Sequence, residues 1–410
     1  MRVYRAEESM AAAQGEGSEG ERAAPRRTEL DTLRVLVVIG LVFFHSALVF
    51  APDNDFYVKN ANTAEVVTVL SGLGVVWAMP ILFLVAGLGT RHSLRRRGPG
   101  GFARERLLRL GVPLVATTLV LTPLPQWLRL RAADPGYHES YLAFWPRFLT
   151  VRLDPADFPF VLDGEHFETG HLWFVVLLLT FSLLLAPVAG RLAGGAEPLA
   201  AAVDRRPALL LLPALPLAAL DALYMEGGFG GWNRWAYLVF FLYGYALADD
   251  LRIRAATRRL ARPVGVLGLL LFAATAPGFM TLDDPLTDRA AFAVLTRALF
   301  GAAGWCWVVA ILGLLDRPER AEVPSSPGRA RARAYLAAAA LPVYVLHQPI
   351  VVAVAYGVVG WPAPMVVKYT AIVAGSLVVI FAVYEVGIRR ARVTRFLLGM
   401  RSGPPPTPAG

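Results

Sequence analysis

Long apolar blocks that alternate with short arginine-rich loops constrain this chain more than any other feature. The blocks run to roughly 17–25 residues, the length that crosses a bilayer core of about 30 Å as a helix rising about 1.5 Å per residue. With 56% hydrophobic and only 17% charged residues, the chain reaches a mean hydropathy of +0.51, which a charge-covered soluble surface rarely allows. The sequence therefore predicts an all-α, polytopic membrane protein with ten transmembrane helices, at about 33–51, 65–90, 110–127, 171–190, 207–224, 235–250, 263–281, 291–315, 335–358 and 364–388.

The arginines predict how these helices are oriented. Alternate loops are rich in arginine, among them "RHSLRRRGPGGFARERLLR", "LRIRAATRRLAR" and the tail "RRARVTR". The loops between them, such as "PDNDFYVKN" and "LDDPLTD", carry few basic residues. Under the positive-inside rule this alternation places both termini in the cytosol. It also explains the formal net charge of +9 as a matter of membrane orientation, so that nucleic acid is not expected as a partner.

The domain organisation follows from the same pattern. We expect a disordered cytosolic tail at 1–28, which lacks the apolar core of a signal peptide, one membrane domain at 29–392, and a Pro-rich cytosolic tail at 393–410. The extracytoplasmic loop at 128–170 is long and carries the aromatic run "YLAFWPRF", which predicts a folded segment over the membrane surface. The single cysteine, Cys306, cannot form an intrachain disulfide and is expected to be packed among apolar residues.

Three histidines lie in or beside predicted spans, where titratable groups are costly and mark function by default. His45 interrupts the apolar run "RVLVVIGLVFFHSALVF", and His347 lies in "LPVYVLHQPIVV". Each is about 18 Å from the cytosolic end of its helix, so the two rings can face a shared cavity. His171 opens the fourth span in "GHLWF", next to Trp173. The alternative for His45 and His347 is a hydrogen bond to a neighbouring helix, and for His171 an interfacial helix cap.

A metal site is disfavoured. His166 and His171 in "EHFETGH" do not match the HExxH pattern of zinc proteases, and no cysteine lies near them.

Charged groups gather on the predicted cytosolic side. Arg104, Arg106 and Arg109 follow a Gly-rich turn and suit phosphate or carboxylate groups, although basic loops also serve topology and anionic lipid. Asp31 and Arg34 at the mouth of the first span are placed to pair, and Glu385 stands one turn before Arg389 in an arrangement that favours an ion pair.

Six stretches taken in order resemble the membrane acyltransferase 3 family, with its glucan-modifying branch, the OPG biosynthesis protein C-like proteins, closest. They are "ELDTLRVLVVIGLVFFHS", "MPILFLVAGLGTRHSLRRR", "FARERLLRLGVP", "GHLWFVVLLL", "YVLHQPI" and "YEVGIRR". The resemblance implies a ten-helix protein of the inner cell membrane that moves an acetyl or succinyl group from cytosolic acyl-CoA to a sugar on the far side. The family's catalytic histidine matches His45, its Arg-x-Arg pair matches Arg104 and Arg106, and its late glutamate matches Glu385. Many relatives carry Pro after that glutamate, where this chain has "EVGIRR".

The resemblance leads to a mechanistic hypothesis. Acyl-CoA would be a co-substrate, with no permanently bound cofactor, and its phosphates would dock on Arg104 and Arg106 with help from Arg109. His45 would act as general base on a hydroxyl of a sugar, glycan or other acceptor, or would carry the acyl group briefly. His347 would be a second proton carrier, and His171 and Trp173 would shape the acceptor site.

Two rival functions remain open from the residues alone. One is an exporter of a polar or acylated compound with His45 and His347 as a proton relay, and the other is a non-catalytic partner in a polymer-modifying complex. Membrane lipids are expected partners in every case, while the acyl group, the acceptor and the oligomeric state are not readable from the sequence.

Overall fold

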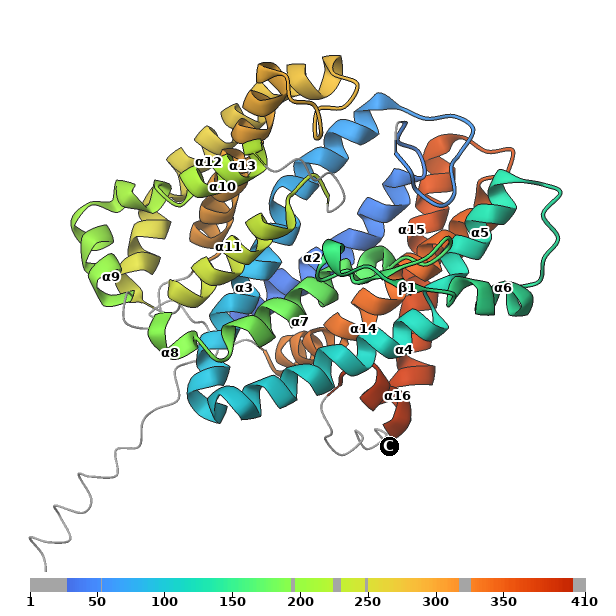
Figure 1. The fold of residues 1–410 in the computed structure, drawn as a ribbon, viewed down its shortest axis with the longest axis horizontal. Coiled ribbons are helices and arrows are strands. Elements are labelled where there is room, and N and C mark those ends of the chain that lie inside the picture. Colours follow the sequence, from blue (N-terminus) through green and yellow to red (C-terminus); the bar gives the residue numbers. More distant parts are fainter. Residues whose placement is uncertain are drawn as a thin grey trace, which may run out of the picture.

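The computed structural model describes residues 28–52, 54–192, 196–223, 230–247, 250–316 and 326–400. The predicted N-terminal tail up to residue 27 and the end of the C-terminal tail from residue 401 lie outside the described residues. The described part is almost entirely helical (Figure 1). Its helices of eight residues or more are α2 (Thr28–Leu48), α3 (Glu65–Arg106), α4 (Val112–Val120), α5 (Pro123–Ala133), α6 (Tyr141–Phe148), α7 (Trp173–Leu185), α9 (Ala196–Arg205), α10 (Ala214–Leu223), α11 (Arg234–Ala246), α12 (Leu251–Thr281), α13 (Ala291–Leu315), α14 (Pro327–Val358) and α15 (Met365–Ala382).

The shorter elements join these helices. Two are π-helical stretches, η1 (Leu107–Gly111) and η7 (Val383–Ile388), and three are 3₁₀ turns, η2 (Pro155–Asp157), η3 (Gly170–Leu172) and η5 (Pro207–Leu211). The short helices are α8 (Ala189–Leu192) and α16 (Arg392–Leu397), and the strands are β1 (Arg152–Leu153) and β2 (Leu162–Asp163).

Six described helical stretches are long and apolar enough to cross a membrane. They are Thr28–Leu48, Glu65–Ala133, Leu251–Thr281, Ala291–Leu315, Pro327–Val358 and Met365–Ile388. A seventh is added if the bent pair Gly170–Leu185 and Ala189–Arg205 counts as one span. The protein is thus a multi-pass membrane protein. Helix covers most of each of the ten predicted segments, but the stretch at 207–223 and α11 are too short to count as spans by length, so the number ten stays a prediction.

The helices form two groups on either side of a central pair (Figure 1). In the first group α13 packs against α10 and α12, and in the second α14 packs against α2 and α15. Between them α3 packs along α11, because two glycines remove the side chains at the crossing: a Cβ at Gly244 would lie 1.9 Å from the Leu84 carbonyl oxygen. Close approach through small residues is the usual way in which helices associate in membranes.

The arginine-rich connection after the second predicted span is helical, although we predicted a loop. α3 continues through it and bends at Gly98, whose φ of 70° lies in the left-handed region that glycine tolerates. Pro99 follows and restarts the helix, where its missing N–H costs nothing. Arg and Leu, both good helix formers, then carry the helix on toward η1.

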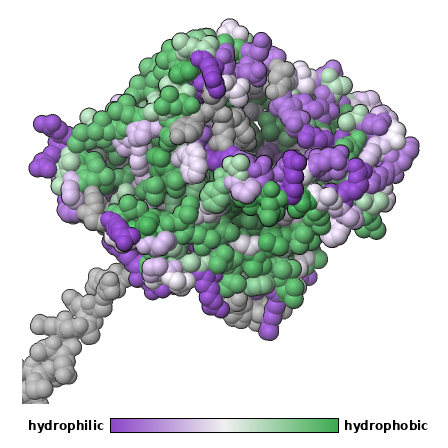
Figure 2. All heavy atoms as spheres, viewed as in Figure 1, coloured by the Kyte–Doolittle hydropathy of each residue, from purple (hydrophilic) through white to green (hydrophobic). Residues whose placement is uncertain are grey.

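The segment at 128–170 is folded, as its aromatic residues predict. It holds the end of α5, then α6, and a two-stranded antiparallel sheet formed by β1 and β2. The indole of Trp145 donates a 2.8 Å hydrogen bond to the Leu119 carbonyl, and that of Trp127 donates one of 3.0 Å to the Glu139 carbonyl. Figure 2 shows hydrophilic surface over this segment and extensive apolar surface over the helices beside it.

Candidate active site

The structure brings His45, His171 and His347 together. They come from α2, from η3 and from α14, which lie far apart in the sequence. The ring centroids of His45 and His347 are 5.0 Å apart, and those of His171 and His347 are 4.9 Å apart. Three imidazoles in contact form one cluster, which we call the histidine cluster.

Backbone carbonyls of α14 orient two of these rings. Nδ1 of His347 lies 2.5 Å from the Tyr344 carbonyl oxygen, and Nε2 of His171 lies 3.1 Å from the Val345 carbonyl oxygen. Because a carbonyl only accepts, each of these nitrogens carries the proton and the other nitrogen of each ring holds a lone pair. The Val345 carbonyl is free to accept because residue 349, its partner in a regular helix, is a proline without an N–H.

Two nitrogens of the cluster have no hydrogen-bond partner among the described residues. They are Nδ1 of His45 and Nε2 of His347, and both atoms are buried. Buried polar atoms are nearly always hydrogen-bonded, so an unpartnered pair needs an explanation such as a catalytic role. The His45 ring is half-buried, and the surface is hollowed over the region where Figure 1 draws the end of α2 (Figure 2).

Trp173 points into a different cluster. Its ring lies 5.2 Å from that of Tyr237 on α11 and 6.4 Å from that of Phe83 on α3. The structure therefore does not bring Trp173 and His171 together in one site, since side chains two residues apart on a helix point about 200° apart.

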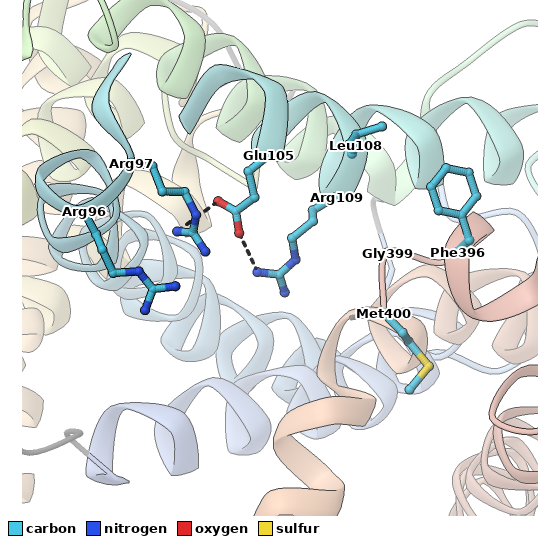
Figure 3. A pocket seen from close by; sticks show the side chains of 8 residues that line it. All are labelled: Arg96, Arg97, Glu105, Leu108, Arg109, Phe396, Gly399 and Met400. Atoms are coloured by element: carbon cyan, nitrogen blue, oxygen red, sulfur yellow. Dashed lines mark hydrogen bonds and ion pairs between the residues drawn. The ribbon is translucent and has the colours of Figure 1, made fainter. Parts of the chain in front are cut away.

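Arginines of the loop that we predict to be cytosolic line a basic cavity (Figure 3). Glu105 accepts from Arg109 at 3.2 Å and pairs with Arg97 at 3.8 Å, so one carboxylate holds two guanidinium groups in place. The cavity has a volume of about 470 Å³. Its lining consists of Arg96, Arg97, Glu105, Leu108, Arg109, Phe396, Gly399 and Met400.

The structure separates Arg104 from Arg106. Arg104 is exposed and does not line the basic cavity. Arg106 is half-buried, donates to Thr90 Oγ1 at 3.3 Å, and lies over the Phe102 ring. Residues two apart on a helix point about 200° apart, so the two cannot grip one phosphate from the same side. The Nε atoms of Arg106 and Arg109 are buried without a partner in the described part of the chain.

Asp31 and Arg34 pair as predicted, at 3.4 Å. Arg34 also donates to the Val85 carbonyl at 3.1 Å, which ties α2 to α3. Along α2, Arg34 stands about 16 Å from His45, which gives the separation between the basic end of this helix and the histidine cluster.

Glu385, which we also take from the sequence as a candidate catalytic residue, lies away from the histidine cluster. It pairs with Arg389 at 2.7 Å, as the spacing predicts, and accepts from Tyr335 at 3.3 Å. Tyr335 is twelve residues before His347 on α14, which is about 18 Å along the helix. Glu385 therefore cannot exchange protons directly with the cluster. With Tyr335 and Arg389 it lies beside a second basic cavity of about 620 Å³, which Arg331 and Arg395 also line.

Four residues at the cluster went unnoticed in the sequence. Phe56 stacks on His45 at 5.8 Å, Gln348 accepts from the His171 backbone N–H at 2.7 Å, and Tyr57 donates to Glu168. Of these four, only Gln348 could have been found from the sequence, because it is a polar residue between His347 and Pro349 within a predicted span.

No metal centre forms in the described ranges, where no group of three His, Cys, Asp or Glu side chains is placed to hold an ion. His166, the other histidine of "EHFETGH", instead contacts Arg147 at 2.7 Å.

The comparisons with known proteins identify a family. A family profile described as an acyltransferase domain, acyltransferase 3, matches residues 27–385, which is most of the chain. Neither the curated proteins nor the solved structures gave a match. The matched range includes all three histidines of the cluster and the basic cavity's arginines. The chain therefore belongs to the acyltransferase 3 family of membrane acyltransferases.

Proposed function

We propose that this protein is an acyl-CoA-dependent O-acyltransferase of the cell inner membrane. It moves an acyl group of the acetyl or succinyl class from cytosolic acyl-CoA to a hydroxyl of an extracytoplasmic sugar or glycan. The observation that carries the proposal is the histidine cluster with its two unpartnered nitrogens, found in a chain of the acyltransferase 3 family. No feature of the described fold favours the exporter alternative.

The cluster supplies the proton transfer that this chemistry needs. A hydroxyl is a weak nucleophile at neutral pH until a base removes its proton, and histidine titrates in that range. His45 accepts the hydroxyl proton as the acceptor oxygen bonds to the thioester carbonyl carbon. The carbon–sulfur bond then breaks, and the CoA thiolate takes the proton, leaving an ester and free CoA.

His347 assists His45 as a second proton carrier. Its Nδ1 donates to the Tyr344 carbonyl, so Nε2 is the nitrogen that can accept a proton. Partial burial excludes competing water, which favours transfer to the acceptor over hydrolysis.

The basic cavity suits the other end of the donor. CoA carries several phosphate charges, and guanidinium groups bind phosphate through paired hydrogen bonds. Arg96, Arg97 and Arg109 line the cavity. Arg106 follows the cavity residue Glu105 in the chain, and its buried Nε has no hydrogen-bond partner among the described residues.

The function is tested with the purified protein in lipid vesicles. Acyl-CoA labelled in its acyl group is supplied on the side of the arginine-rich loops, and the label is followed into water-soluble glycans on the other side. We expect transfer that depends on acyl-CoA and leaves free CoA. Transport of a solute with no consumption of acyl-CoA would contradict the proposal.

The separation of the two arginines makes a prediction about donor binding. Arg106→Ala should raise the KM for acyl-CoA by about 10-fold or more, because a charge-assisted hydrogen bond contributes about 1.5–3 kcal/mol. Arg104→Ala, which removes the same charge from an exposed position, should change it by no more than about twofold. The measurement is the acyl-CoA dependence of turnover for both variants and the wild type. Equal effects of the two variants would show that the arrangement seen at this loop does not bind the donor.

A further inference from the structure

The outer side of the histidine cluster is built from residues that our mechanism has not yet used. Phe56 lies 5.8 Å from His45 with the ring planes only 25° apart, and it contacts Tyr57 at 5.6 Å. Phe56 and Tyr57 are both buried. An aromatic face thus covers the very ring that our mechanism assigns as the base.

A carboxylate stands next to that aromatic face. Tyr57 donates its hydroxyl proton to Glu168, 111 positions later in the sequence. Gly170 makes this approach possible, because a Cβ there would lie 3.1 Å from the Tyr57 hydroxyl and 3.5 Å from Gln348 Oε1. The same Gln348 oxygen accepts from the His171 N–H. Glu168 and Tyr57 therefore adjoin the histidine cluster.

The outer segment that carries Glu168 is acidic overall. The segment 128–170 holds seven acidic residues against four arginines, and three of those arginines form salt bridges, with Asp55, Glu139 and Asp163. The cation nearest to the pair, Arg129, stacks on the Tyr57 ring at 5.4 Å while paired with Asp55. A carboxylate ligand entering here would meet like charge, whereas a neutral one would not.

We propose that Phe56, Tyr57 and Glu168 form the acceptor subsite, and that it selects uncharged polyhydroxy compounds over acidic ones. Glu168 is a binding residue that accepts a hydrogen bond from a hydroxyl next to the one that is acylated. Phe56, stacked on His45, forms the apolar wall of the subsite. This inference rests on the proposed function, because it names the acceptor class of the same site.

The protonation of Glu168 provides a signature. Burial raises the pKa of this carboxyl above its usual value, Asp55 raises it further, and Tyr57 and Arg129 oppose the rise. An ionised carboxylate accepts from a hydroxyl more strongly than a protonated one. The KM for the acceptor should therefore increase as the pH falls through this raised pKa, and that dependence should vanish when the group cannot titrate.

The test compares Glu168→Gln with Glu165→Gln, which removes the same charge from an exposed position of the same loop. The purified protein in vesicles receives labelled acyl-CoA and one of four acceptors, the methyl glycosides of glucose, galactose and mannose or methyl glucuronoside. We expect the wild type to show a kcat/KM at least about 10-fold higher for a neutral glycoside than for the glucuronoside. Glu168→Gln should raise the KM for the neutral acceptor about 10-fold and leave kcat and the KM for acyl-CoA within twofold. It should also reduce the ratio of kcat/KM for the neutral glycoside to kcat/KM for the glucuronoside. Glu165→Gln should match the wild type, and Tyr57→Phe should shift the acceptor KM in the same direction as Glu168→Gln.

Three results would overturn the inference while leaving the proposed function intact. They are a wild-type preference for the glucuronoside, equal behaviour of the two glutamate variants, and acyl transfer to some other hydroxyl with none to the neutral glycosides. A wild-type protein that consumes no acyl-CoA would remove the proposed function, and the inference with it.

Discussion

Replacing His45 with alanine should reduce acyl transfer by about 10²–10⁴-fold, the range in which a positioned general base contributes. The ring is the half-buried member of the histidine cluster, and its Nδ1 has no partner among the described residues. Its loss removes the group that we propose as the base but breaks no hydrogen bond within the described part of the chain. We therefore expect the variant to express, to insert and to bind acyl-CoA as the wild type does.

The control is His138→Ala, because His138 is an exposed histidine outside the cluster. Turnover of labelled acyl-CoA with an acceptor is measured for both variants, together with CoA binding and thermal unfolding in detergent. Wild-type turnover in His45→Ala would remove the histidine from the mechanism. A loss of turnover accompanied by a large drop in melting temperature would instead assign His45 a packing role.

A single methyl group at position 244 should destabilise the fold strongly. The Cβ of Gly244→Ala would lie 1.9 Å from the Leu84 carbonyl oxygen and 2.7 Å from its carbon. Both are backbone atoms, so no side-chain rotation relieves the overlap, and α3 and α11 must move apart. Overpacking of this kind costs about 1–3 kcal/mol and sometimes more.

Gly40→Ala is the matched control, since a Cβ at Gly40 on α2 would meet nothing within 4 Å. Alanine replaces glycine in a helix there with a gain of up to about 1 kcal/mol, so this variant should be as stable as the wild type or more so. The two variants are compared by thermal unfolding in detergent, in which the fraction of protein that remains monodisperse is measured as the temperature rises. Equal melting temperatures would show that α3 and α11 do not cross as closely as described.

The sequence carried the membrane class and the depth of the histidines, because both depend on properties read along one helix. Apolar length defines a span, and a rise of about 1.5 Å per residue places His45 and His347 at the same depth. The sequence could not show in which direction around the helix axis a given side chain points. Arg104 and Arg106 look like one pair in the sequence, yet their side chains leave the helix on different faces. The same applies to Trp173, which turns toward Phe83 and Tyr237.

Contacts between distant loops were equally out of reach. Tyr57 and Glu168 meet only because a connecting loop and the folded outer segment pack together at Gly170. Neither residue lies in a predicted span, so the rule that ionisable groups inside a membrane mark function did not select them. Glu385 lies inside the last predicted span, and in the structure it is held by Arg389 and Tyr335, which is about 18 Å along α14 from His347.

Pro349 weakens helix α14 but provides a hydrogen-bond acceptor for His171. By leaving the Val345 carbonyl without an intrahelical donor, it gives His171 the acceptor that holds its tautomer. Alanine at that position would complete the helical ladder, and the new N–H would compete with an imidazole 174 positions away in the chain from Val345. Pro349→Ala should therefore raise the thermal stability of the protein while it loosens the orientation of the His171 ring.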